Sequence, residues 1–215
     1  MNINKFKHFG YYHSTNNFFT NDDCIYQIAN FFNRKHIKLL LNIIKFQKKI
    51  STGKGFLIDL FDYKYFKNRV NINKIIENAK IKKIITSYSK DLKFTKSALF
   101  YTPDNKSIMK SQKFHFDHNE PFHQLKVFIL LNKINSNSGP FTFIDAKKSK
   151  VFLCSKKNKF DDDEIFNSIG SNSLNLFTGN IADIIFIDTA RCLHYGARNN
   201  LNKRLMLMLK YEKEN

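Results

Sequence analysis

The second half of the chain is a series of short apolar segments separated by turn residues. From residue 91 onward the segments are rich in Phe, Ile, Leu and Val, with turn signals such as Asn135-Ser-Asn-Ser-Gly-Pro140 between them. We expect strands near residues 95–102, 112–117, 124–131, 140–145, 150–154, 174–177, 183–188, 192–197 and 204–211. Eight or nine short strands at this spacing predict a two-sheet jelly roll.

The first 90 residues have a different pattern. Apolar residues recur at helical spacing from Ile25 to about Lys49 and again from Asn73 to Ser89, which predicts two helices. The fold class is therefore mainly β with N-terminal helices, and we expect residues 1–215 to form a single domain. Within it, residues 1–90 are mostly helical and pack on a jelly-roll core of residues 91–215. The acidic segment Phe160–Phe166 predicts a short helix. As a mobile insertion between strands, it is also a candidate lid for a binding site in the jelly roll.

Composition sets limits on the class of protein. An apolar content of 42% with 23 Phe is typical of a globular domain. No run approaches 18 apolar residues and the N-terminus lacks the apolar segment of a signal peptide, so we expect a cytoplasmic protein with no membrane partner. Three cysteines without metal-ligand spacing suit a reducing compartment. The sequence leaves the oligomeric state open.

The net charge of +18 has three explanations. Lys is spread along the whole chain together with Asn, Ile, Phe and Tyr, all of which have AT-rich codons, so compositional drift is the simplest explanation. A basic surface also suits an anionic small-molecule substrate. Nucleic acid is the least expected partner, because no strong basic cluster is present.

A possible metal site begins at His115-Phe-Asp117. Residues two apart in a strand point to the same side, so this segment offers one imidazole and one carboxylate together. A third candidate, His194, lies near the start of a later predicted strand. Two His and one carboxylate with other positions open is the ligand set of non-haem Fe(II) oxygenases. His118 and His123 are rival ligands, for which we favour a surface or substrate-loop position.

The order of these motifs resembles the phytanoyl-CoA dioxygenase-like family of Fe(II)/2-oxoglutarate-dependent oxygenases. The resemblance covers roughly residues 95–211 and depends on five segments taken together. They are His-Phe-Asp-His at 115–118, the apolar strand 125–132, Asn-Ser-Gly-Pro-Phe-Thr-Phe-Ile at 137–144, residues 186–196 around His194, and Arg204 with its apolar strand. The resemblance implies a double-stranded β-helix, a cupin-like jelly roll, with the N-terminal helices outside one sheet.

By this resemblance His115, Asp117 and His194 hold Fe(II), with 2-oxoglutarate and O2 as co-substrates. The expected activity is hydroxylation of a small molecule with release of succinate and CO2. The far carboxylate of 2-oxoglutarate needs a bidentate cation, for which Arg is better suited than Lys. Family spacing points to Arg204, with Arg198 and Arg191 as competitors. Lys126, within an apolar strand, is a weaker candidate for co-substrate or substrate contact.

One departure from the family pattern and two alternatives bear on the function. The segment Asp145–Ser149 replaces a family motif that borders the substrate, so the substrate cannot be carried over. In the halogenase variant of this family a small residue replaces the carboxylate ligand. The carboxylate is present here as Asp117, so a halogenase is disfavoured. A non-catalytic basic β-sandwich that binds nucleic acid or another anion is the first alternative. A cupin-type metalloenzyme that does not use 2-oxoglutarate is the second, and an outward-facing Arg204 would favour it.

Overall fold

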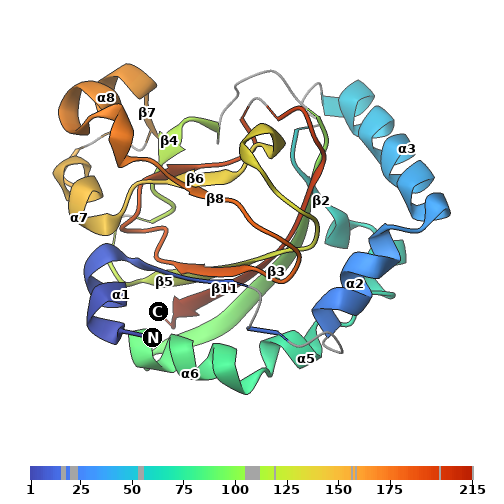
Figure 1. The fold of residues 1–215 in the computed structure, drawn as a ribbon, viewed down its shortest axis with the longest axis horizontal. Coiled ribbons are helices and arrows are strands. Elements are labelled where there is room, and N and C mark those ends of the chain that lie inside the picture. Colours follow the sequence, from blue (N-terminus) through green and yellow to red (C-terminus); the bar gives the residue numbers. More distant parts are fainter. Residues whose placement is uncertain are drawn as a thin grey trace.

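The architecture is two antiparallel sheets that face each other, with helices around them (Figure 1). The computed structural model describes residues 1–15, 18–19, 24–52, 56–104, 112–118, 120–155, 157, 159–198 and 200–214, except the side chains of residues 51 and 52. The six-stranded sheet has the order β1 (Tyr11–Ser14), β9 (Ile184–Ile187), β5 (Gln124–Leu130), β11 (Arg204–Lys213), β3 (Leu92–Thr102), β2 (Ile58–Asp59). The five-stranded sheet has the order β7 (Lys159–Phe160), β4 (Phe114–His115), β10 (His194–Tyr195), β6 (Phe141–Phe143), β8 (Asn175–Phe177).

Strand β11 lies in the middle of the larger sheet and is buried on both faces. Its residues Leu205, Leu207 and Leu209 belong to the core beneath the helices, whereas Met206 and Met208 belong to the core between the sheets. A strand covered on both sides is expected to be continuously apolar, which is what Leu205–Leu209 shows. Arg204 has the same parity as the two methionines, so its side chain is directed between the sheets.

The N-terminal helices cover the outer face of the six-stranded sheet (Figure 1). Their shared feature is an apolar stripe that joins one large core with the sheet. They are α1 (Ile3–Phe9), α2 (Cys24–Phe32), α3 (Lys35–Thr52), α4 (Lys64–Lys67), α5 (Asn73–Ile76) and α6 (Ala79–Tyr88), with the 3-10 turn η1 (Leu60–Asp62). The remaining short elements are η3 (Ser136–Ser138), α7 (Ala146–Ser149), η4 (Lys150–Phe152), α8 (Asp162–Ile169) and η5 (Ser171–Ser173). No helix within the described ranges combines the length and apolar character needed to cross a bilayer.

The jelly roll with N-terminal helices is confirmed, but several element boundaries differ from the prediction. The first predicted helix is two helices, α2 and α3, and the second is α5 and α6, with the Asn78 side chain capping α6. Residues 20–23, whose Thr, Asn and Asp types favour a helix start, and Gly53–Gly55, which favours a helix end, lie outside the described residues. The predicted helix near Phe160–Phe166 is confirmed as α8, which begins with a capping box at Asp161 and Glu164.

One expectation was wrong. The predicted strand 150–154 is η4 following α7, because the Asp145 carboxylate accepts the Lys148 amide at 3.0 Å and starts a helical turn there. The N-terminal part also contributes a strand, since β1 pairs with β9 at the edge of the larger sheet. An edge strand of four residues without strict alternation gives little periodicity to detect.

Candidate metal centre

Strands β4 and β10 bring the two sequence-distant histidines together. His194 is registered opposite His115 on one side and Phe143 on the other. Cross-strand partners point to the same face, so both imidazoles are directed between the sheets. Asp117 follows β4 directly, and its backbone amide donates to the Thr189 carbonyl at 3.0 Å. That bond fixes the turn that carries the carboxylate toward the two rings.

His115, Asp117 and His194 converge on one point. The Asp117 carboxylate lies 3.8 Å from His115 Nε2 through Oδ1 and 3.2 Å from His194 Nε2 through Oδ2. One possible ligand atom from each of the three lies within 4.8 Å of the others. Nitrogen and carboxylate oxygen atoms at this spacing can share one metal ion.

In each imidazole, the Nδ1 atom is hydrogen-bonded to a backbone carbonyl, which fixes the orientation of the ring. His115 Nδ1 lies 2.8 Å from the Lys113 carbonyl, and His194 Nδ1 lies 2.9 Å from the Cys192 carbonyl. A carbonyl only accepts hydrogen bonds, so we assign the proton of each neutral ring to Nδ1. Both Nε2 lone pairs are therefore free toward Asp117. This outer support is typical of metal-ligating histidines.

The charges of the site favour a neutral His115 and an ionised Asp117. Burial, followed by the nearby His194, lowers the pKa of His115 to about 4. Burial opposes ionisation of Asp117, but His194 and Lys126 outweigh it and hold the Asp117 pKa well below its usual value. Neutral imidazole and ionised carboxylate are the protonation states that bind a metal ion.

Lys126 is the unexpected member of the site. The sequence left its direction open, and the structure directs it inward from β5, where Nζ lies 2.6 Å from Asp117 Oδ2. This is the same oxygen that faces His194 Nε2. Its side chain is 17% exposed and that of Asp117 is 22% exposed, so the pair is only partly shielded from water. The ammonium group therefore neutralises the one carboxylate of the candidate centre.

Arg204 is a buried cation that has no acidic partner among the described residues. Its guanidinium donates to the carbonyl of Gly139, which lies between η3 and β6, at 2.7 Å and to Thr102 Oγ1 of β3 at 3.2 Å. Within the described ranges no carboxylate pairs with it, and its buried Nε has no hydrogen-bond partner. Burial lowers the Arg204 pKa to about 10, which leaves it charged at neutral pH. A buried charge of this kind is costly unless an anion joins it.

The competing arginines already have partners. Nη1 of Arg198 donates to both carboxylate oxygens of Asp162 in α8, at 2.7 and 2.8 Å, and the guanidinium lies over the Tyr195 ring. Arg191 donates to the Lys7 carbonyl and to Tyr88 Oη, and lies over the Phe122 ring. Cys192 is part of the core between the sheets.

One buried acid that the sequence analysis did not single out connects the loops around the site. Asp188 accepts the Tyr88 hydroxyl at 2.7 Å and the Phe122 amide at 3.2 Å, as well as two amides of its own turn. Burial raises its pKa despite these bonds. Asp188 thereby joins the loop after Asp117 to the loop before His194. The only signal for it in the sequence is an acid at the end of an apolar strand.

His118 and His123 are separate from the three converging residues. Their rings stack on each other with centroids 3.8 Å apart, and Glu120 completes a second group of possible ligands. His118 Nδ1 accepts the Glu120 amide at 2.9 Å. We keep both histidines as loop residues beside the site.

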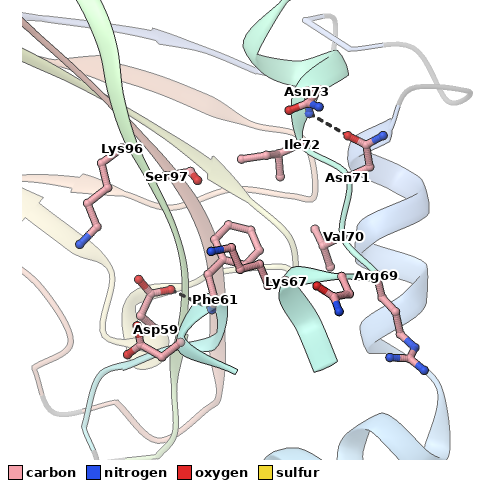
Figure 2. Close-up of a pocket in the computed structure, with 12 residues that line it drawn as sticks. Asp59, Phe61, Lys67, Arg69, Val70, Asn71, Ile72, Asn73, Lys96 and Ser97 are labelled. Atoms are coloured by element: carbon pink, nitrogen blue, oxygen red, sulfur yellow. Dashed lines mark hydrogen bonds between the residues drawn. The ribbon is translucent and has the colours of Figure 1, made fainter. Parts of the chain in front are cut away.

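A hollow of about 580 Å³, lined by both basic and acidic side chains, lies apart from these residues, between β3 and the segment from β2 to α5 (Figure 2). Figure 2 shows Lys96 and Ser97 directed to opposite sides of their strand, with Lys96 toward Asp59. None of the three converging residues lines this hollow. It therefore has no part in the candidate metal centre.

Comparison with solved structures identifies the architecture. EvdMO1 has a TM-score of 0.60 at 14% identity, with 99% of this chain and 49% of EvdMO1 covered. The epimerase SnoN, in complex with Fe3+, alpha-ketoglutarate and nogalamycin RO, has a TM-score of 0.60 at 13% identity, with 98% and 82% covered. EctD from S. alaskensis with bound Fe has a TM-score of 0.61 at 14% identity, with 98% and 75% covered. The chain has the fold of the non-haem iron/2-oxoglutarate-dependent enzymes.

This fold is the double-stranded β-helix that the motifs predict, and that prediction is confirmed. The chain spans about half the length of EvdMO1 but most of SnoN and EctD. No family model matches the sequence, and no curated protein sequence matches it. At 10–15% identity the likeness assigns the fold, while the reaction and substrate have to be argued from the residues of this chain.

Proposed function

We propose that this chain is an Fe(II)/2-oxoglutarate-dependent oxygenase that oxidises a small molecule, most simply by hydroxylation, with release of succinate and CO2. The observation that carries the proposal is the convergence of His115, Asp117 and His194 in the same interior that receives Arg204. A metal site alone suits many cupin-type enzymes. An inward-facing arginine without an acidic partner favours those that also bind a dicarboxylate.

The donor set fits Fe(II). His115 and His194 would supply Nε2 atoms whose tautomers are fixed from behind, and Asp117 would supply an ionised carboxylate. Three protein ligands leave other positions open for the co-substrate and O2. When bound, the iron and 2-oxoglutarate supply the oxidising chemistry, and the protein supplies binding and orientation.

Arg204 would anchor the far carboxylate of 2-oxoglutarate. It already donates to Gly139 and Thr102, which fix the plane of the guanidinium. Gly196 lies beside that plane, since a Cβ placed there would be 3.5 Å from Nη2 and 3.7 Å from Nη1. The missing side chain leaves space against the guanidinium for an anion. A bidentate pair would then offset the cost of burying the charge.

An anionic substrate would suit the side of the candidate centre where Lys126 lies beside Asp117. Lys126, Lys210 and Lys96 form a row of registered neighbours across β5, β11 and β3. The next positions on this face, Phe128 and Met208, lie in the core between the sheets, so Lys126 and Lys210 face the same interior, whereas Lys96 is exposed beside the hollow of Figure 2. Lys126 pairs with Asp117 and Lys210 with Glu212, whereas Lys96 has no ion pair within the described ranges. A metal ion on Asp117 would release Lys126 to bind a carboxylate or phosphate.

The purified protein with Fe(II), ascorbate and O2 is expected to convert 2-oxoglutarate to succinate, even slowly without its main substrate. A chelator should stop this conversion, and His118→Ala should leave it within about twofold, because His118 is not one of the three converging residues. Chromatographic quantification of succinate checks the result. Succinate formation that persists in chelator would contradict the proposal.

Lys126→Met is expected to bind Co(II) about tenfold more tightly than the natural protein in the absence of 2-oxoglutarate. The ammonium group 2.6 Å from Asp117 repels a divalent ion and competes for the same oxygen. Visible absorption titration with Co(II) measures the affinity. Lys210→Met is the matched control, because Lys210 lies in the same row but pairs with Glu212. Weaker binding by Lys126→Met would instead assign Lys126 the role of orienting the carboxylate.

A further inference from the structure

Helix α3 has apolar residues on two opposite faces. Ile37, Leu41 and Ile44 are buried against the large core. On the other side a stripe of four large apolar residues faces solvent, and we call it the α3 stripe: Leu39 (57% exposed), Ile43 (52%), Phe46 (65%) and Ile50 (70%). At about 100° per residue these four fall within about 60° of one another around the helix axis. Four such residues in one line differ from the singly scattered exposed apolar residues of an ordinary surface.

Positive charge borders the α3 stripe on one flank. Between residues 24 and 58 the chain has seven Lys or Arg and no Asp or Glu. Within α3, Lys35, Lys38 and Lys49 are exposed and lie on one flank of the stripe. Figure 1 shows α3 on the rim of the molecule, on the side away from α7 and α8, so the stripe does not adjoin them.

We infer that α3 docks this chain on an anionic lipid surface as a peripheral contact. A helix with an apolar face flanked by lysines lies in the membrane interface, with the apolar side chains among the acyl chains and the lysines at the head groups. Here the opposite face of the helix stays attached to the protein core. This inference replaces the expectation from the sequence that the chain has no membrane partner, and it does not depend on the proposed enzymatic function.

Charge distinguishes a lipid surface from a second copy of the chain. The spacing of the α3 stripe also suits pairing of two helices. Pairing would bring the flanking lysines of one copy toward those of the other, and each copy carries a net charge of +18. Like charges across such an interface are repulsive, whereas anionic head groups are attracted. The lipid surface is therefore the occupant that fits both the apolar and the charged residues.

Vesicle co-sedimentation tests the inference. The full chain is expected to bind vesicles of phosphatidylcholine with 30% phosphatidylserine at least about tenfold more tightly than pure phosphatidylcholine, and to be released by about 0.5 M NaCl. Phe46→Ser/Ile50→Ser should lower binding by about tenfold or more, because two inserted side chains are lost. Lys35→Glu/Lys49→Glu should lower it similarly.

The matched controls change exposed residues of the same types elsewhere. Val151→Ser/Leu201→Ser removes two exposed apolar side chains and Lys83→Glu/Lys147→Glu reverses two exposed lysines outside α3, and both should bind like the natural protein. Circular dichroism should show that all variants stay folded. Equal binding to both vesicle types, or equal losses in the controls, would overturn the inference. A dimer in light scattering that Phe46→Ser/Ile50→Ser converts to monomer, without vesicle binding, would overturn it in favour of self-association.

Discussion

Asp117→Ala is expected to reduce Fe(II)-dependent succinate formation to background and to weaken Fe(II) or Co(II) binding by more than about a hundredfold. Loss of an outer partner of a ligand already costs about 10–100-fold, and Asp117 would be a ligand itself. The substitution also leaves Lys126 without its partner beside the two imidazoles, so an uncompensated positive charge would repel the ion. Metal titration and succinate quantification check the two effects separately.

His118→Ala is the control, because it changes the adjacent residue of the same turn without touching the converging groups. It should keep metal affinity within about twofold. Thermal unfolding of both metal-free variants should show that they remain folded. Metal-dependent activity that survives Asp117→Ala would reject the assignment of the centre.

Arg204→Met is expected to weaken 2-oxoglutarate binding by about a hundredfold while leaving the metal affinity unchanged. Removing the cation from a buried charge-assisted pair costs about 2–5 kcal/mol. Without co-substrate, the stability of the variant should stay within about 1 kcal/mol of the natural protein. The substitution removes the stabilising hydrogen bonds to Gly139 and Thr102, but it also removes the destabilising cost of burying an unpaired charge, so the two effects nearly cancel.

Thermal unfolding with and without 2-oxoglutarate measures both consequences in one experiment. A saturating ligand at about a hundred times its Kd stabilises by about 2.7 kcal/mol, so the natural protein should unfold at a clearly higher temperature with 2-oxoglutarate. Arg204→Met should show no such increase. Arg198→Met is the matched control: it breaks the pair with Asp162 and should lower stability but keep the response to 2-oxoglutarate. If Arg198→Met abolished the stabilisation by 2-oxoglutarate and Arg204→Met kept it, Arg198 would be the residue that binds the far carboxylate.

The sequence predicted the fold where local patterns report on burial. The apolar run of β11 and the alternation around β4 are visible without a structure, because each strand meets a core on one or both faces. The edge strand β1 was missed, since its pairing with β9 comes from distant parts of the chain. The expected strand 150–154 failed for the opposite reason: a local cap at Asp145 overrode strand propensity.

For the candidate site, spacing proposed the three converging residues and Arg204, but not what surrounds them. Parity could not decide the direction of Lys126, because both faces of β5 are buried. Its pair with Asp117 depends on how the turn after β4 folds back. The bonds of Asp188 to Tyr88 and Phe122 join three separate segments, and no spacing rule connects them.

The central position of β11 determines when the larger sheet can close during synthesis. Strand β11 follows β3 and β5 in the chain and pairs with both, so the larger sheet stays open until residues 204–213 have left the ribosome. Until then the facing edges of β3 and β5 lack their neighbour and expose backbone groups that can pair with other chains. Because most strand pairs join distant segments, closure should be slow. Slower translation or lower temperature during expression should therefore raise the soluble yield more than changes to the N-terminal helices.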